Sequence, residues 1–116
     1  MKQDQLSEQS MAFAVSVIGL VKELRTAHET ILSSQLGRSG TSIGANLREA
    51  QFAQSRADFI TKLQIALKEA NETRYWLELL YRTKYLNAER YRELDRQCAS
   101  LVSMLVSSLK TAKSSL

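Results

Sequence analysis

The sequence predicts an all-α protein, an antiparallel up-down-up-down four-helix bundle that forms a single domain over residues 1–116. Three observations support this prediction. The chain has no proline and only four glycines, so the residues that usually interrupt helices are scarce. Apolar residues recur at steps of three and four along four successive segments, and no segment shows the alternation typical of a strand. The connections between these segments are short, which favours antiparallel neighbours.

The first helix is expected over residues 7–27, with Ser7 as its N-cap. Its apolar seam faces the bundle core and consists of Phe13, Val17, Leu20, Leu24, Ala27 and Ile31. Ile31 could lie past the end of this helix, because the boundary with the next segment is indistinct over residues 28–34.

The second helix is expected over residues 33–54 and contains the stretch SQLGRSGTSIGANLREA. Propensity alone favours a loop here, because glycine inside a helix costs about 0.5–1 kcal/mol relative to alanine. Apolar and small residues nevertheless share one helical stripe, made of Leu36, Ser39, Gly40, Ile43, Asn46, Leu47 and Ala50. The missing side-chain bulk indicates that a neighbouring helix approaches closely. The Gly40–Gly44 spacing is that of a GxxxG pair, but the segment is too rich in serine for a membrane helix.

The third helix is expected over residues 56–86, with Ser55 as N-cap and Asp58 as the acid of a capping box. Its first seam is formed by Phe59, Leu63, Ala66, Ala70, Thr73, Leu77 and Tyr81. A second row on a rotated face comprises Ile65, Glu69, Glu72, Trp76 and Leu79. A monomeric bundle helix needs only one apolar stripe, so this second row predicts a contact between copies of the chain.

The fourth helix is expected over residues 88–112, after Asn87 as N-cap and with Glu89 in its first turn. Its seam consists of Tyr91, Leu94, Cys98, Leu101, Leu105, Ser108 and Ala112. Cys98 is the single cysteine, so it forms no internal disulfide, and its place on the seam favours a packing residue over a reactive thiol.

The sequence offers no catalytic, metal or cofactor site. Di-iron bundles need Glu-x-x-His pairs, whereas the only histidine, His28, has no glutamate three residues before it and is expected to be exposed near a helix end. No serine or cysteine has a histidine placed as its base, and the glycine-rich stretch lacks the phosphate-loop pattern. Glu69 and Glu72 leave three alternatives open. They could be solvated and paired with Lys68 or nearby arginines, form a polar network that fixes helix register or a subunit contact, or take part in catalysis.

The formal net charge of +4 is compatible with a nucleic-acid partner, although the basic residues are spread along the chain. Arg38 and Arg48 are expected on the outer face of the second helix beside Phe52, and RYWLELLYRTKY interleaves aromatic and basic residues. The candidates for RNA or DNA contact are Arg38, Arg48, Arg56, Arg74, Arg82 and Lys84. Alternatively, these aromatic residues pack and the bases form a solvated face. Assembly of several copies would repeat this weakly basic face and so strengthen its binding to a polyanion.

No stretch is apolar enough to cross a membrane, and the N-terminus lacks a basic-then-apolar signal pattern, so we expect a cytoplasmic protein without a membrane partner.

The stretch SQLGRSGTSIGANLREA and the segment SRADFITKLQIALKEANETRYWLELL that follows it resemble the four-helix-bundle family of 23S ribosomal-RNA intervening-sequence proteins. The resemblance runs from about residue 34 to residue 80. The matching positions are Gln35, Leu36, Arg38, Ser39, Ser42, Ile43, Ala45, Asn46, Leu47 and Glu49, then Ala66, Glu69 and Leu77. Many members have arginine where Gly37 stands, proline where Gly44 stands and glycine where Ala50 stands.

The resemblance implies a homopentamer without enzyme activity. Relatives also include accessory variability proteins of diversity-generating retroelements, which bind a reverse transcriptase and nucleic acid. Two hypotheses follow: a self-assembling bundle that presents a basic surface to RNA or DNA, or an adaptor that binds a partner protein. An enzyme that uses Glu69 or Glu72 is the third alternative.

Overall fold

A computed structural model describes residues 2–114 of the chain, with side chains from residue 5 onward. Its helices are α1 (Lys2–Thr26), α2 (Ile31–Gln51), α3 (Arg56–Arg82) and α4 (Ala88–Ser114). No strand occurs within this range, which confirms the all-α prediction.

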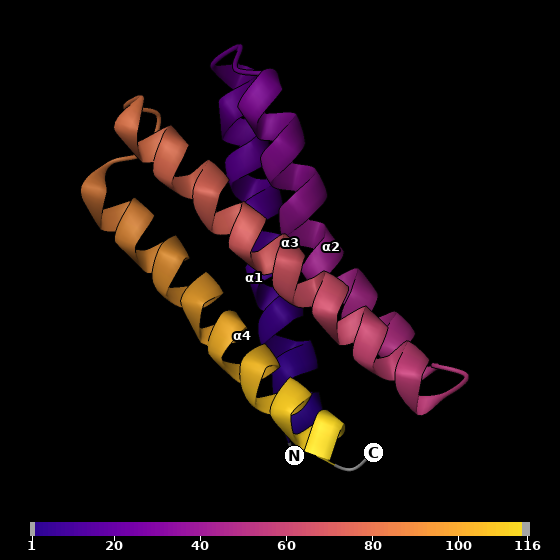
Figure 1. The fold of residues 1–116 in the computed structure, drawn as a ribbon. Helices are drawn as coiled ribbons and strands as arrows, with labels where there is room; N and C mark the ends of the chain where they lie inside the picture. The colour runs from indigo at the N-terminus through magenta and orange to yellow at the C-terminus, as the bar shows by residue number, and fades with distance from the viewer. Residues whose placement is uncertain (1, 115–116) are drawn as a thin grey trace.

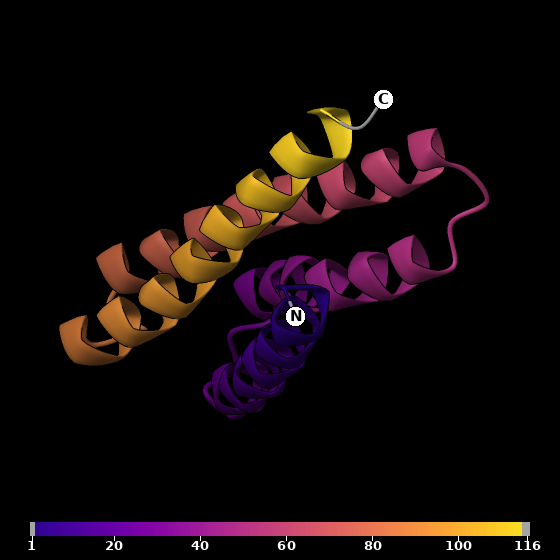
Figure 2. The same cartoon turned by 90° about the horizontal axis from the view of Figure 1, so that it is seen from below.

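The four helices form two hairpins, α1–α2 and α3–α4, which lie one over the other as two layers (Figure 1 and Figure 2). Within residues 2–114, α1 and α3 each pack on α2 and α4, whereas no Cα atoms of the diagonal pairs α1–α3 and α2–α4 lie within 8 Å of each other. Neighbouring helices run antiparallel, because Gly40 and Gly44 of α2 lie against Val17 and Ser10 of α1, in that order. The bundle is elongated, with extents of 47 × 22 × 19 Å.

The predicted seams supply most of the core. The largest fully buried side chains come from all four helices and are Leu6, Phe13, Val17, Leu20, Leu36, Ile43, Thr73, Leu77, Leu80, Cys98, Leu101 and Leu105. Burial of one such leucine or phenylalanine stabilises the fold by about 1.5–3 kcal/mol. The core therefore accounts for a stable bundle without a disulfide or a bound metal.

The glycine-rich stretch is helical, and it is the surface on which α1 packs. A Cβ placed on Gly40 would lie 2.9 Å from both Cγ atoms of Val17, and one on Gly44 would lie 3.2 Å from Ser10 Oγ. The expected close approach of a neighbouring helix is confirmed at these two positions. Gly37 has ordinary space, because its Cβ would lie 3.5 Å from Val21.

Two helix starts carry the predicted caps. Ser55 Oγ accepts a hydrogen bond of 3.0 Å from the Asp58 amide, and Asp58 Oδ2 accepts one of 3.2 Å from the Gln54 amide. Asn87 Oδ1 accepts a 2.8 Å bond from the Arg90 amide. The amides of Asp58 and Arg90 have no partner inside the first turn of their helices, and these caps supply one. The returning bond of the predicted capping box goes to the amide of Gln54, one residue before the N-cap, and not to that of Ser55.

Several predicted boundaries are wrong. Helix α1 begins at Lys2 and not at residue 7, so Ser7 lies inside the helix, where it accepts a 2.9 Å bond from Gln51 Nε2 instead of capping. Helix α2 spans Ile31–Gln51 and not 33–54, α3 ends at Arg82 and not at 86, and α4 continues to Ser114 and not to 112.

The ends of α1 and α3 lack the glycine that usually marks such a stop. His28 and Lys84 adopt the left-handed conformation, with φ of 65° and 71°. The amides that follow, of Glu29 and Tyr85, bond back to the carbonyls of Leu24 and Leu80. This is the Schellman pattern, and without glycine the sequence gives no clear signal for it.

Four seam assignments also need correction. Ala27 is exposed, because α1 ends one residue before it. Ile31 is 74% exposed at the first position of α2, because the chain turns before it. Tyr81 is exposed and stacks on Tyr91 with ring centroids 4.7 Å apart. Asn46 is half-buried at the edge of the α2 stripe, and its Nδ2 donates to Ser42 O over 2.8 Å.

Candidate functional site

One polar cluster joins α2 to α3, and we call Arg38, Glu69, Glu72 and Trp76 the Arg38 cluster. Arg38 Nη1 lies 2.9 Å from Glu69 Oε2, and its Nη2 binds the Glu72 carboxylate. Trp76 Nε1 donates to Glu72 Oε2 over 3.0 Å. The guanidinium of α2 therefore holds two carboxylates on adjacent turns of α3.

The cluster shows how the two glutamates are paired within the protomer. Glu69 is only 7% exposed, and a buried carboxylate is costly unless a cation and hydrogen bonds compensate it. Arg38 supplies both, across the helix interface, and Lys68 does not take part in the pair. Glu69 and Glu72 thus form a polar network between α2 and α3. Because its guanidinium already pairs with two carboxylates, Arg38 is a weaker candidate for phosphate binding than an unpaired arginine.

Two further basic candidates are paired inside the chain. Arg74 grips Asp95 of α4 with Nε–Oδ1 of 2.8 Å and Nη2–Oδ2 of 3.1 Å, and this hydrogen bonding raises the pKa of Arg74. Arg82 pairs with Glu78 over 2.8 Å on the surface of α3. Fork-like contacts of the Arg74 kind are the stronger type of charged hydrogen bond. An arginine held in such an ion pair is less available to bind the phosphate of a nucleic acid.

The remaining three basic candidates are more available. The Arg56 guanidinium lies 6.0 Å from the centre of the Phe59 ring, while Arg48 and Lys84 are exposed and make no ion pair among the described residues. Arg48 and Arg56 stand near the α2–α3 connection, and Lys84 stands on the α3–α4 connection at the other end of α3 (Figure 1). The six candidates are therefore not gathered into one patch on the protomer.

The candidate oligomer row lies on the flank of α3 that borders α2. Ile65, Trp76 and Leu79 are each half-buried, and Trp76 packs partly against the core. Tyr75 beside them is 59% exposed and meets the Trp76 ring edge-to-face, with centroids 5.0 Å apart. The row thus keeps exposed apolar and aromatic surface even though its two glutamates bind Arg38.

The residues of the family motif serve the packing of α2. Ile43 is fully buried, Gly40 and Gly44 admit α1, and Glu49 lies 3.4 Å from Lys62 of α3. Ser39, on the same helix, accepts a 2.9 Å bond from Thr73 Oγ1 inside the α2–α3 interface. The motif is therefore a packing device on both sides of α2.

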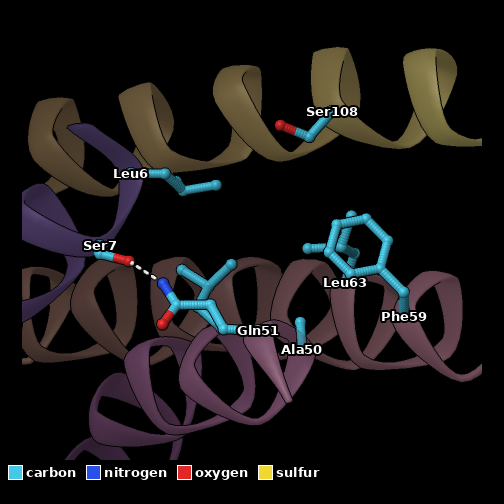
Figure 3. Close-up of a pocket in the computed structure, with 8 residues that line it drawn as sticks. Leu6, Ser7, Ala50, Gln51, Phe59, Leu63 and Ser108 are labelled. Atoms are coloured by element: carbon cyan, nitrogen blue, oxygen red, sulfur yellow. Dashed lines mark hydrogen bonds between the residues drawn. The ribbon is translucent and has the colours of Figure 1, made fainter. Parts of the chain in front are cut away.

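A small pocket opens at the end of the bundle near the α2–α3 connection (Figure 3). All four helices contribute to its wall, through Leu6, Ser7, Leu47, Ala50, Gln51, Phe59, Leu63 and Ser108. Its volume of about 20 Å³ suits a single water molecule and is far below that of a metabolite site. The bond from Gln51 to Ser7 closes one side of it.

Reactive groups are sparse in the described part of the chain. Burial raises the pKa of the Cys98 thiol to about 12, and its Sγ donates to Ala70 O over 3.3 Å, so this cysteine is a packing residue. His28 is exposed in the turn after α1, as expected. Among residues 5–114, no three metal-binding side chains lie close enough together to hold an ion.

The sequence interpretation missed one surface. Met11, Val15 and Ile18 on α1 are 53%, 66% and 41% exposed, on the side of the helix away from the core. Their steps of four and three form a second apolar row, the same signal that was recognised on α3. Beside them lies an open groove of about 460 Å³ between α1 and α2, floored by Ser10 and Gly44.

Comparison with known proteins agrees with this fold. None of the helices in the described range is both long and apolar enough to span a bilayer. No curated protein matches the chain. A crystal structure of a protein with unknown function from the S23 ribosomal protein family of Bacteroides thetaiotaomicron is similar, with a TM-score of 0.93 and 51% sequence identity. The similarity covers 95% of this chain and 99% of that one. The family model for 23S rRNA-intervening sequence proteins matches residues 2–107, and the chain belongs to this family.

Proposed function

We propose that this chain is a non-enzymatic bundle that assembles into a homopentamer, and that the assembly binds RNA or DNA through its unpaired basic side chains. The observation that carries the proposal is the flank of α3. There Tyr75 is 59% exposed beside half-buried Ile65, Trp76 and Leu79, although the protomer core is already complete. Exposed aromatic residues in an apolar surround are typical of interface anchors.

The charge of the assembly supports the second half of the proposal. Each protomer carries +4, so a pentamer carries five times that charge over a compact surface. Arg48, Arg56 and Lys84 are the candidates with no acidic partner among the described residues. Arg38, Arg74 and Arg82 contribute to the field, but their ion pairs weaken them as phosphate ligands. Repetition around a ring would let a few weak contacts act together.

Analytical ultracentrifugation tests the assembly. We expect the natural chain to sediment as a pentamer, and Trp76→Ala to give smaller species that keep their helical circular dichroism. Tyr85→Ala is the matched control, because Tyr85 is 47% exposed in the α3–α4 connection, away from the row. A Trp76→Ala variant with an unchanged oligomer would show that the row does not face a neighbouring copy.

Filter binding across a salt series tests the ligand. We expect RNA or DNA to be retained at low ionic strength and released as salt rises, because binding to phosphates displaces counterions. Replacing Arg48 and Arg56 together with glutamine should flatten the salt dependence, whereas Lys110→Gln on α4 serves as the control. If an intact oligomer retains neither RNA nor DNA, the adaptor alternative gains weight. Nuclease-insensitive co-purification of one specific polypeptide would then be its signature.

A further inference from the structure

The outer face of α1 carries a complete helix-pairing seam that the protomer does not use. Glu8, Met11, Val15, Ile18 and Lys22 follow one another at steps of three, four, three and four, and all five are exposed. This alternation is the spacing of a two-stranded coiled-coil seam. Helix α1 packs on α2 and α4 within the described residues, and both lie on its other side. The seam is therefore free along about 21 Å of helix, at 1.5 Å per residue.

The seam is complementary to itself when it is turned around. Glu8 and Lys22 stand seven residues before and after Val15, at opposite ends of the apolar centre. In an antiparallel pair with its two-fold axis at Val15, each Glu8 meets the Lys22 of the other copy, while Met11 lies near Ile18. In a parallel pair, like charges would face each other at both ends. Neither Glu8 nor Lys22 has an ion-pair partner among the described residues of its own chain.

Gly19 gives a second and independent indication. It lies one turn after Val15, inside the helix, where glycine costs about 1 kcal/mol relative to alanine. Gly40 and Gly44 repay that cost by admitting α1, whereas a Cβ on Gly19 would meet nothing within 4 Å. No contact inside the protomer accounts for this glycine. A helix from outside could approach the backbone closely at that point.

The groove next to the seam offers room for the side chains of such a helix. Met11 and Ala14 form its α1 wall, Thr41 and Ala45 form its α2 wall, and the volume is about 460 Å³. An apolar side chain that overhangs the seam of one copy can enter the groove of the other. On the α2 wall the small Thr41 and Ala45 leave space open, and the charged Arg48 and Glu49 line the same groove.

We propose that the outer face of α1 is a two-fold docking surface for a second copy of this chain, with the two α1 helices antiparallel and crossing at Val15. The surface is distinct from the α3 flank named for the proposed pentamer. It joins two protomers or, where rings form, two rings. Three apolar residues a side bury less than the roughly 800 Å² per partner of a standard interface, so the association is weak and concentration-dependent.

Charge reversal tests the orientation. We expect Glu8→Lys and Lys22→Glu each to weaken the association about tenfold in sedimentation experiments over a concentration series, which corresponds to about 1.4 kcal/mol. The double swap, Glu8→Lys with Lys22→Glu, restores the contacts and keeps the net charge of the natural chain. Lys110→Glu on exposed α4 is the matched control and should leave the association unchanged. A double swap no better than the single variants would overturn the proposal.

Cross-linking tests the axis itself. With Val15→Cys the two introduced thiols face each other, so mild oxidation should yield a disulfide-linked dimer. Val106→Cys on α4, at a position 38% exposed, is the control and should yield none. The natural Cys98 is fully buried and does not interfere. Failure of Val15→Cys to cross-link, cross-linking of Val106→Cys to the same extent, or a natural chain that never doubles its mass would disprove the pairing. If Trp76→Ala reduces the oligomer while the α1 variants leave it unchanged, the assembly depends on the α3 flank and the α1 pairing is disproved.

Discussion

Arg38 Nη1 lies 2.9 Å from Glu69 Oε2, so that a half-exposed guanidinium on α2 neutralises a carboxylate buried in α3. The pair is asymmetric, because the Arg38 side chain is 48% exposed and the Glu69 side chain is 9% exposed. Removing the Arg38 side chain is therefore expected to destabilise the fold more than the modest burial of Arg38 suggests. The glutamate stays behind in a site where water reaches it poorly.

Arg38→Ala should lower the free energy of unfolding by about 1–3 kcal/mol, the range for an unpaired charged hydrogen-bonding group. Arg48→Ala on the same helix should change it by less than about 0.5 kcal/mol, because Arg48 is exposed and unpaired. Urea unfolding of both variants measures the difference. Equal stabilities would mean that water replaces Arg38 at Glu69.

Gly40 and Gly19 should respond in opposite ways to substitution by alanine. Gly40→Ala should destabilise the protein, because its Cβ would lie 2.9 Å from the branched Val17 side chain, which is fully buried and stiff. Gly40→Leu should disrupt the bundle. Gly19→Ala has free space and should stabilise the dilute protomer by about 0.5–1 kcal/mol. Thermal melts of the three variants check this, and full retention of the melting temperature in Gly40→Leu would argue against close packing there.

His28→Gly should stabilise the protein by about 1 kcal/mol, because glycine adopts the left-handed conformation without the steric cost of a side chain. The exposed imidazole makes no hydrogen bond in the described structure, so little is lost with it. Chemical denaturation measures the gain. Thr83→Gly is the control, since Thr83 has φ of −92° and gains nothing from glycine. A destabilised His28→Gly would indicate a contact of the histidine outside the protomer.

Acid should weaken the link between α1 and α4. Arg90 Nη1 lies 2.6 Å from Glu23 Oε1, and this hydrogen bond lowers the pKa of Glu23 below its ordinary value of 4.5. The pair therefore stabilises the fold above about pH 4.5, and the contribution is lost as the pH falls through the lowered pKa of the folded state. Because the Glu23 side chain is 60% exposed, the pair contributes at most about 1 kcal/mol to the free energy of unfolding.

The measurement compares Glu23→Gln with the natural chain in urea at neutral and acid pH. The stability gap should be present at neutral pH and should close as the pH falls through the lowered pKa of Glu23. Glu8→Gln in dilute solution is the control, with no gap at either pH, because Glu8 has no partner among the described residues. A gap for Glu23→Gln that persists in acid would show that the hydrogen bond, and not the charge, stabilises the link.

The correct predictions rest mostly on local sequence signals. Ser55 and Asn87 cap their helices, and Leu94, Leu101 and Leu105 form the buried face of α4. Gly40 allows the close approach of α1. These features were predictable because capping and periodicity depend on residues within one or two turns. The start of α1 and the stop of α3 before Lys84 were missed, whereas the end of α1 at Thr26 lies one residue from the predicted position. The start of α1 has no breaker to mark it, and the stop of α3 uses a side chain in a conformation that favours glycine.

By itself the sequence determined an all-helical bundle, its four segments and the face of each that is buried. Only the tertiary structure decided which charges meet: Arg38 with Glu69 and Glu72, Arg74 with Asp95, and Arg90 with Glu23. These partners lie 21 to 67 residues apart, and long side chains can reach several neighbours. Helix crossing and rotation select one of them, and no local pattern records that choice.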